Sequence, residues 1–523
     1  MSTQSTRWPV VLGLCLGVLC NAPYAAPRHA DGGQGFLSPP HDHVSPQLDA
    51  ALARAAGEGE ALLRARGDWQ EADTRKAAKV SGMLWPVGPI PGIGDQWTGI
   101  SNFVDHDPAS PNRVLDYTCG TRTYDTSGGY NHAGVDIFLW PFGWHLMDHG
   151  SIDVRAAASG VLLAKDDGNP DRSCSLDAPD TPNYVLVRHG DGTVARYLHL
   201  QTGSVTSKAI GETIAAGEVL GRVGSSGVSS GPHLHFELRA NSSPSAAVID
   251  PFNGSCNAVS SGWAAQRPYH DSQLNRLSTH SAAPQLASCP NTTDTPNFLD
   301  QFRPGDRAVF LAAYRDQRKG QITQFRIRRP DQSLLTQWTH DLANQANAPD
   351  VYNASYWYWS IALPANAPTG VWTFEADFEG QTERHTFRVD TLAAVTPVSD
   401  PRGLIGVWFD PASSGQGMEV HWLEGDLLVV FFYGYRDSGA NLFLLGTRSG
   451  RPNYHELITV PMQSATGGRF NHFDPNSIVR SQWGELRLTL HSCTQASAEL
   501  IGADGQQTLQ LERLGRTTGL DCG

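Results

Sequence analysis

Two short stretches of the sequence carry side chains of the kinds that bind metal ions. His132 and Asp136 are spaced as His-x-x-x-Asp, and His233 and His235 form a His-x-His pair. Apolar residues alternate with these side chains, which predicts extended strands whose successive side chains point to opposite faces. His233 and His235 would then share one face, toward which Asp136 can also converge.

Two imidazoles and one carboxylate form the ligand set of a catalytic rather than a structural zinc site. Structural zinc is closed by four protein ligands, whereas catalytic zinc keeps its fourth tetrahedral position for water, whose pKa it lowers to about 7. The sequence has no His-Glu-x-x-His motif, so a glutamate base is not expected. We therefore interpret the chain as a zinc hydrolase.

A third motif and the order of the connecting segments extend this pattern. Tyr197-Leu198-His199-Leu200 supplies a Tyr-x-His between the two metal-binding stretches. The region from Trp85 to Phe252 resembles the lysostaphin-type zinc endopeptidases, also called LytM-domain proteins, which cut the peptide part of bacterial peptidoglycan. The resemblance implies an antiparallel β catalytic domain of the duplicated hybrid motif fold.

The resemblance also implies a role for each residue of these motifs. His132, Asp136 and His235 would bind one zinc ion per chain. His199 and His233 would be catalytic without binding the metal, because they would orient or deprotonate the water and stabilise the oxyanion. Which of the two does which stays open, as does the bond that is cut.

We expect a secreted zinc metalloendopeptidase that hydrolyses peptide bonds in peptidoglycan stem peptides or cross-links. Two alternatives stay open. One is a secreted protease acting on ordinary proteins, and the other is a non-catalytic LytM-type regulator or wall-binding protein. Such regulators usually lack zinc ligands, so the complete ligand set argues against the second alternative.

Length and composition exclude several other classes of function. The chain has 523 residues, 40% of them hydrophobic, which is enough for three or four domains. It carries 39 basic and 52 acidic residues, and its net charge of -13 argues against nucleic acid as a partner. With 53 glycines, 33 prolines and few helical patterns, mainly β structure is expected.

The first residues have the layout of a secretory signal peptide, which we place at 1–25. No later stretch approaches the roughly 18 apolar residues that a membrane span needs. We therefore expect a secreted protein, or one in the periplasm or cell envelope, without a transmembrane segment. Residues 26–82 should be a helical N-terminal region, either a propeptide or a helix packed on the catalytic domain. In latent relatives an upstream asparagine fills the fourth zinc position; Asn102 is a candidate, although an ordinary loop role is favoured.

Changes of pattern divide the rest of the chain into four segments. They are a lysostaphin/LytM-type zinc peptidase domain at 83–255, a linker at 256–298, an immunoglobulin-like β-sandwich at 299–392 and a C-terminal β domain at 403–523. Apolar and polar residues alternate in the strands expected for the last two segments. Neither of these two segments contains a recognisable catalytic constellation.

Two further features suggest functions of their own. An insertion from Trp140 to Ile152 could form a wall of the substrate groove, and we do not assign its His145 and His149 to the metal. Half of the aromatic run Tyr356-Trp357-Tyr358-Trp359 should be core, which leaves Tyr356 and Tyr358 as candidates for stacking on sugars.

Six cysteines follow the signal peptide, an even number that predicts three disulfides in an exported protein. Their pairing does not follow from the sequence. Domain layout favours one pair, and proximity along the chain alone suggests the other two: Cys493 with Cys522, Cys119 with Cys174, and Cys256 with Cys289.

Overall fold

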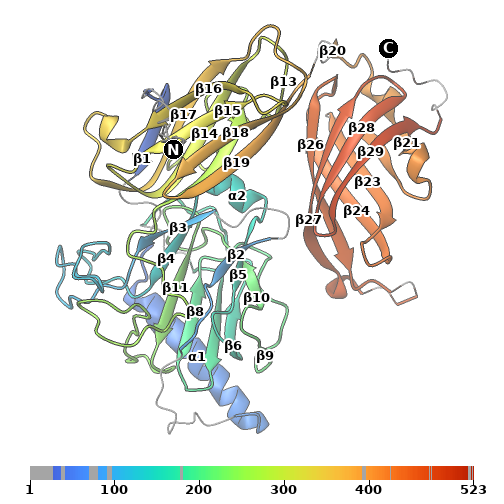
Figure 1. The fold of residues 1–523 in the computed structure, drawn as a ribbon. Helices are drawn as coiled ribbons and strands as arrows, with labels where there is room; N and C mark the ends of the chain where they lie inside the picture. Colours follow the sequence, from blue (N-terminus) through green and yellow to red (C-terminus); the bar gives the residue numbers. More distant parts are fainter. Residues whose placement is uncertain are drawn as a thin grey trace, which may run out of the picture.

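The structure is a computed structural model, and it confirms the expected mainly β fold, arranged as three β units along the chain (Figure 1). The expected signal peptide lies outside the described residues. No helix among the described residues is long and apolar enough to cross a membrane. The residues that the structure describes are 28–36, 42–69, 81–90, 97–176, 181–390, 396–423, 426–469, 471–472, 474–515, 520 and 522.

The first unit is built on a seven-stranded sheet that contains both metal-binding stretches. Its strands lie in the order β3 (Thr98–Asn102), β4 (Val135–Leu139), β11 (His233–Arg239), β8 (Val194–Leu198), β7 (Tyr184–His189), β6 (Gly160–Asp166) and β9 (Thr213–Ile214). A three-stranded sheet shares its core: β10 (Val219–Arg222), β5 (Ile152–Arg155) and β2 (Val87–Pro89). Leu234 and Phe236 point into this core, as the alternation along β11 predicted.

Helix α1 (Pro46–Arg66) packs on the catalytic sheet. Its side chains Leu52, Ala56 and Leu63 form an apolar cluster with residues of β6, β7 and β8. The carboxylate of Asp49 lies 2.5 Å from Arg196 and 3.0 Å from Arg239. The N-terminal helix is therefore fixed to the catalytic unit by apolar burial and by ion pairs.

The second unit is a sandwich of two sheets. One sheet has the order β1 (Gly32–Phe36), β17 (Val351–Ala362), β14 (Arg307–Arg318) and β12 (Gln273–His280). The other contains β13 (Gln301–Phe302), β19 (Gln381–Val389), β18 (Gly370–Phe378), β15 (Thr323–Arg328) and β16 (Leu334–His340), followed by η1 (Leu342–Asn344). Strand β12 comes from the segment expected to be a linker, and β1 comes from the N-terminal region.

The third unit is a closed barrel, which the sequence did not reveal. Its strands are β21 (Gly406–Phe409), β22 (Gly417–Leu423), β23 (Leu427–Tyr435), β24 (Asn441–Ser449), β26 (Leu457–Thr466), β27 (Val479–Leu490), β28 (Gln495–Gly502) and β29 (Gly505–Arg513). Pairing of β21 with β29 closes the barrel. The shorter elements are β20 (Thr396–Pro397), η2 (Pro401–Leu404), η3 (Pro411–Ser413), β25 (Asn453–Tyr454) and η4 (Pro475–Ser477).

The insertion forms helix α2 (Gly143–Asp148) and the contact between the first two units. Trp140 and Phe142 lie in one buried cluster with Tyr356, while Trp357 and Trp359 belong to the sandwich core. Strand β1 pairs with β17 along the residues that include Tyr356 and Tyr358. Both tyrosines suggested for sugar stacking are thus at least partly covered in this structure.

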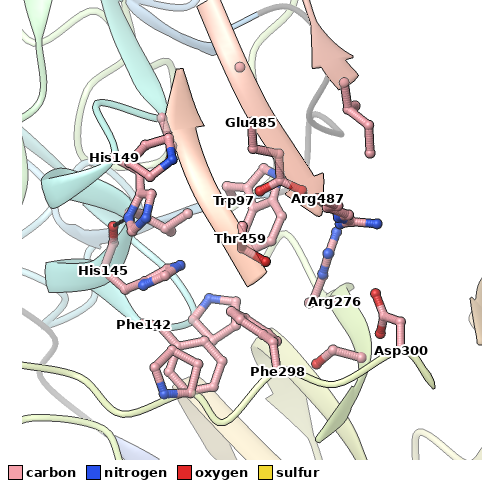
Figure 2. A pocket seen from close by; sticks show the side chains of 18 of the residues that line it. Trp97, Phe142, His145, His149, Arg276, Phe298, Asp300, Thr459, Glu485 and Arg487 are labelled. Atoms are coloured by element: carbon pink, nitrogen blue, oxygen red, sulfur yellow. Dashed lines mark hydrogen bonds and ion pairs between the residues drawn. The ribbon is translucent and has the colours of Figure 1, made fainter. Parts of the chain in front are cut away.

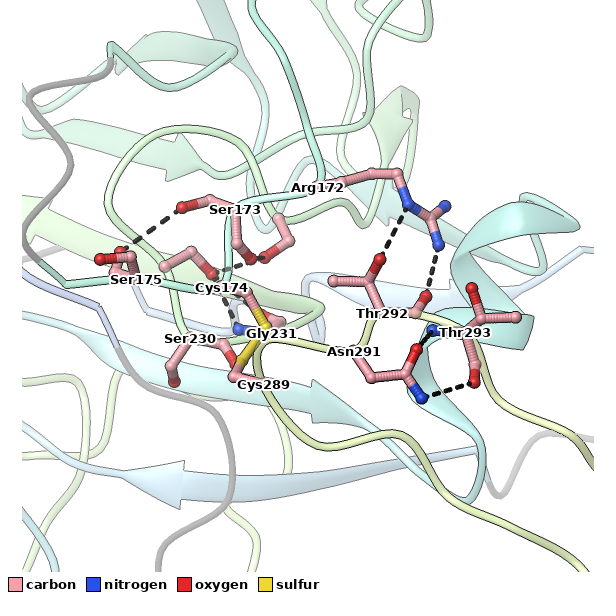
Figure 3. Close-up of a disulfide and its surroundings, with 12 residues drawn as sticks. Arg172, Ser173, Cys174, Ser175, Ser230, Gly231, Cys289, Asn291, Thr292 and Thr293 are labelled. Carbon is pink, nitrogen blue, oxygen red and sulfur yellow. Dashed lines mark hydrogen bonds between the residues drawn. A yellow bond between two sulfur atoms is a disulfide. The ribbon is translucent and has the colours of Figure 1, made fainter.

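Two of the three expected disulfide pairings are wrong. The bonds join Cys119 to Cys256 and Cys174 to Cys289, whereas Cys493 is bonded to Cys522 as expected. Cysteines that are distant in sequence meet because their loops are folded together, and the Cys256 N–H donates to the carbonyl of Tyr117. The bond to Cys289 lies beside Ser230 and Gly231, in the loop that leads into β11 (Figure 3).

Candidate metal centre

Strand pairing brings the predicted residues together at one face of the catalytic sheet. Asp136 of β4 and Leu198 of β8 lie on either side of His235 in β11. His132 precedes β4 and His199 directly follows β8, so both loop residues enter the same region. All five residues predicted for the site are fully buried, each with a relative exposure of 0%.

Three of these side chains meet closely enough to share a metal ion. The Oδ1 atom of Asp136 lies 3.1 Å from His132 Nε2 and 3.1 Å from His235 Nδ1. The two ring nitrogens are 3.3 Å apart. Imidazole nitrogen and carboxylate oxygen are the ligand types of zinc sites, so this donor set fits the ion.

A fourth donor, Asp42, comes from the N-terminal region and was missed by sequence analysis. One carboxylate oxygen lies 3.0 Å from His235 Nδ1, and the Asp42 side chain is buried. The donor atoms of Asp42, His132, Asp136 and His235 all lie within 4.8 Å of one another. Asp42 sits in a segment without periodicity, so nothing in the sequence pointed to it.

Hydrogen bonds fix which nitrogen each imidazole presents to this cluster. His132 Nδ1 lies 2.7 Å from the carbonyl of Phe103 and must donate to it, which leaves Nε2 for the cluster. His235 Nε2 faces Glu237 Oε2 at 3.4 Å, which leaves Nδ1 of His235 to face the cluster. Such outer partners orient metal-binding histidines in general. Glu237 was missed, although its position two residues after His235 on β11 places it on the same face.

Gly134, which lies between His132 and Asp136, is packed so closely that no side chain fits there. A Cβ atom on Gly134 would lie 2.7 Å from the ring of His235. Any larger residue would therefore push this ring away from His132 and Asp136. The motif thus sets the position of His235 as well as supplying two of the donors.

The charges around the cluster favour ionised carboxylates. Burial alone would raise the pKa of Asp136, but His132 and His235 outweigh it and hold the pKa below its usual value. Burial also opposes ionisation of Asp42, yet His235 and His199 keep the pKa of its carboxyl well below the usual range. Ionised carboxylates are the form that binds cations.

The two remaining histidines lie beside the cluster with different hydrogen-bonding patterns. His233 Nδ1 donates to the carbonyl of Gly231 at 2.8 Å, and its Nε2, 3.9 Å from Asp136 Oδ1, has no hydrogen-bond partner among the described residues. Burial, reinforced by His199, lowers the pKa of His233 to about 4. This imidazole therefore presents a free lone pair toward the cluster.

Each ring nitrogen of His199 instead faces an oxygen atom. Nδ1 lies 2.6 Å from the carbonyl of Ser226, and Nε2 lies 2.9 Å from Asp42 Oδ2. The residue has a φ of 65°, in the left-handed region that residues other than glycine rarely adopt. Such strain is found at functional sites held in place by their surroundings. The Nε2 atom of His199 thus points at an oxygen atom in the site.

Other residues considered from the sequence do not join the cluster. Asn102 donates to Asp136 Oδ2 at 3.0 Å, so it orients a carboxylate and does not occupy the place of Asp42. His145 and His149 of the insertion pack against each other with tilted rings, whose centroids are 4.1 Å apart, and belong to neither group of potential metal donors found in the described part of the chain.

Comparison with known proteins agrees with this geometry. A stretch of this chain is 35% identical over 171 residues to the DD-carboxypeptidase/endopeptidase Mpg of Neisseria meningitidis. The match covers 30% of this chain and 37% of that protein. The chain is 32% identical over 103 residues to the peptidoglycan DD-endopeptidase ShyC of Vibrio cholerae, covering 20% and 23%. Lysostaphin of Staphylococcus staphylolyticus is 26% identical over 201 residues, covering 38% and 37%.

The chain thus spans between 23% and 37% of the length of these relatives. Residues 131–247 match peptidase family M23. This range includes His132, Asp136 and His235. The resemblance to LytM-type proteins is therefore confirmed, and residues 131–247 form a domain of peptidase family M23.

Proposed function

We propose that the protein is a zinc metalloendopeptidase that acts outside the cytoplasm on peptide bonds of peptidoglycan. The observation that carries the proposal is the convergence of His132, Asp136 and His235 in one buried cluster beside His199 and His233. The catalytic unit would occupy residues 83–255. The relatives named as peptidoglycan endopeptidases support this class of substrate.

In this proposal zinc is held by His132 Nε2, His235 Nδ1 and a carboxylate oxygen of Asp136. Zinc, when bound, polarises the scissile carbonyl and makes a nucleophile available at neutral pH. Phe103 and Glu237 hold the two imidazole rings in the required orientation. The protein supplies a dry, pre-oriented site, which strengthens electrostatic stabilisation of the transition state.

The two hydrogen-bonding patterns support different roles for the remaining histidines. His233 accepts the proton of the attacking water, because its Nδ1–H is held by Gly231 and its Nε2 lone pair is free. His199 donates from Nε2 to the oxyanion, because that atom already faces a carboxylate oxygen of Asp42. The Asp42 oxygen thus stands where a negatively charged substrate oxygen would develop.

The form described by the structure is latent in this proposal. Asp42 would supply a fourth ligand to a bound zinc ion, and its carboxylate lies beside His199, so a substrate carbonyl could reach neither the metal nor His199. Tyr124 adds a hydrogen bond from its hydroxyl to the same carboxylate. We therefore propose that the N-terminal region, residues 26–82, is a propeptide.

Metal content tests the ligand assignment independently of activity. The purified protein should contain about one zinc per chain, and His132→Ala or Asp136→Ala should lose it. His421→Ala, which removes a partly exposed histidine of the barrel, is the control and should keep the metal. Full zinc occupancy in both site variants would show that the ligands are wrongly chosen.

Substrate specificity tests the function itself. Protein freed of its N-terminal region should release soluble muropeptides from purified sacculi, with cleavage in the peptide part shown by mass spectrometry. It should leave a denatured soluble protein such as casein largely intact. Digestion of casein but not of sacculi would favour a general secreted protease, and no hydrolysis of either substrate by a zinc-loaded protein would favour a regulator.

A further inference from the structure

A cavity of about 620 Å³ lies where the three β units meet (Figure 2). It is distinct from the metal centre, because none of the residues of the buried cluster lines it. The first unit contributes Trp97 and helix α2, the second contributes β12 and the segment before β13, and the barrel contributes β26, β27 and β28. A ligand in this cavity would touch all three units.

The charged groups that line the cavity are paired, with one exception. Arg487 donates to Glu485 at 2.7 Å, and His385 Nε2 lies 3.0 Å from Asp300 Oδ1. The side chain of Arg276 in β12 makes no hydrogen bond or ion pair with any residue that the structure describes. Its guanidinium instead lies over the ring of Trp97, 4.3 Å from the centroid.

The surroundings of Arg276 favour binding of a negatively charged ligand beside it. Its guanidinium stays charged at all ordinary pH values, and a partly buried charge without a partner is costly. Burial, the largest influence, lowers the pKa of Arg276, and the nearby carboxylates of Asp300 and Glu485 offset this effect only in part. A planar guanidinium fork matches the two oxygens of a carboxylate.

The remaining lining narrows the class of ligand further. Trp97, Phe142 and Phe298 provide apolar walls beside the guanidinium. Burial and the neighbouring His149 lower the pKa of His145 to about 3, so this imidazole adds no positive charge. The carboxylates of Asp300 and Glu485 would repel any negative charge on the ligand that is not held at Arg276. The lining therefore fits one negative charge attached to an apolar body.

We propose that this cavity is a binding site for a small monocarboxylate with an apolar body, anchored by Arg276 and packed against the apolar walls of the cavity. A free peptide carboxyl terminus and an N-acylated amino acid both belong to this chemical class. Because its walls come from all three units, the bound ligand would also stabilise their relative arrangement. The proposal does not depend on the peptidase function.

Calorimetric titration of the full-length protein with N-acetyl-L-phenylalanine tests the proposal. Saturable binding at about one site per chain is expected, and the matching amide, which has the same shape without the charge, should bind about tenfold more weakly or worse. This comparison uses the unaltered protein, so it does not depend on the folding of a variant. Equal binding of acid and amide, or no saturable binding of the acid up to about 10 mM, would overturn the proposal.

Variants locate the site. Arg276→Gln should weaken binding of the acid by about tenfold or more. Arg276→Lys should bind the acid with an affinity between those of the parent and Arg276→Gln, since lysine keeps the charge but lacks the two-pronged guanidinium. Arg480→Gln, which changes an exposed arginine of β27 outside the cavity, should bind like the parent. Binding that survives Arg276→Gln but is lost in His132→Ala would place the carboxylate at the metal centre and contradict the proposal.

Discussion

His233→Ala should keep about one zinc per chain and hydrolyse peptidoglycan peptides about 100-fold more slowly, or worse, than the parent. His233 lies beside the proposed ligands, and its free Nε2 is the group positioned to take a proton from the attacking water. Initial rates on a soluble cross-linked muropeptide and zinc content should be measured together, with all proteins freed of residues 26–82.

His199→Ala should show a similar loss, because the oxyanion loses its donor. The matched control is His189→Ala, which removes another buried histidine of the same sheet, one that donates to Ser159 and lies away from the cluster. The control should retain zinc and most of the activity. Parent-like rates in either site variant would refute its catalytic assignment, whereas loss of zinc would move that histidine into the ligand set.

Asp42→Ala should raise the rate of the full-length protein by about tenfold or more. The carboxylate lies beside His199 and His235, and a hydrogen bond to a charged group stabilises a state enough to shift an equilibrium about tenfold. Asp42→Asn, which keeps the size of the side chain and removes its charge, should give a smaller increase. The assay is the initial rate on the same muropeptide at equal zinc content.

Glu58→Ala is the control for this experiment, since it removes an exposed carboxylate from α1 without touching the cluster. It should leave the rate of the full-length protein unchanged. A rate for Asp42→Ala equal to or below that of the parent would contradict the proposed latency. The peptidase function would still stand if the protein freed of residues 26–82 were active.

Strand periodicity made much of the site predictable. His233 and His235 share a face because side chains alternate along β11, and Asp136 converges with them because β4 is the neighbouring strand. The same rule, extended by two residues, would have found Glu237. Asp42 could not be predicted, because its position depends on how a segment without periodicity is carried to the catalytic sheet.

Long-range pairing limited the prediction of the fold in the same way. Alternating apolar residues identified the β units but could not show that β21 and β29 close a barrel, since the paired residues are more than a hundred positions apart. The pairing of Cys119 with Cys256 and of Cys174 with Cys289 likewise depends on loops that meet only in the folded protein.

Asp42 lies in the chain between β1 and α1, and these two elements are attached to different units. Strand β1 pairs with β17 of the sandwich, and α1 packs on the catalytic sheet. In the proposed latent form Asp42 would act as a tethered inhibitor whose occupancy of the site depends on its effective local concentration. Loss of the β1 anchor alone would lower this concentration and give partial activation. A chain break beyond α1 would leave Asp42 in place, and full activity would then follow only when the severed peptide dissociates and is diluted.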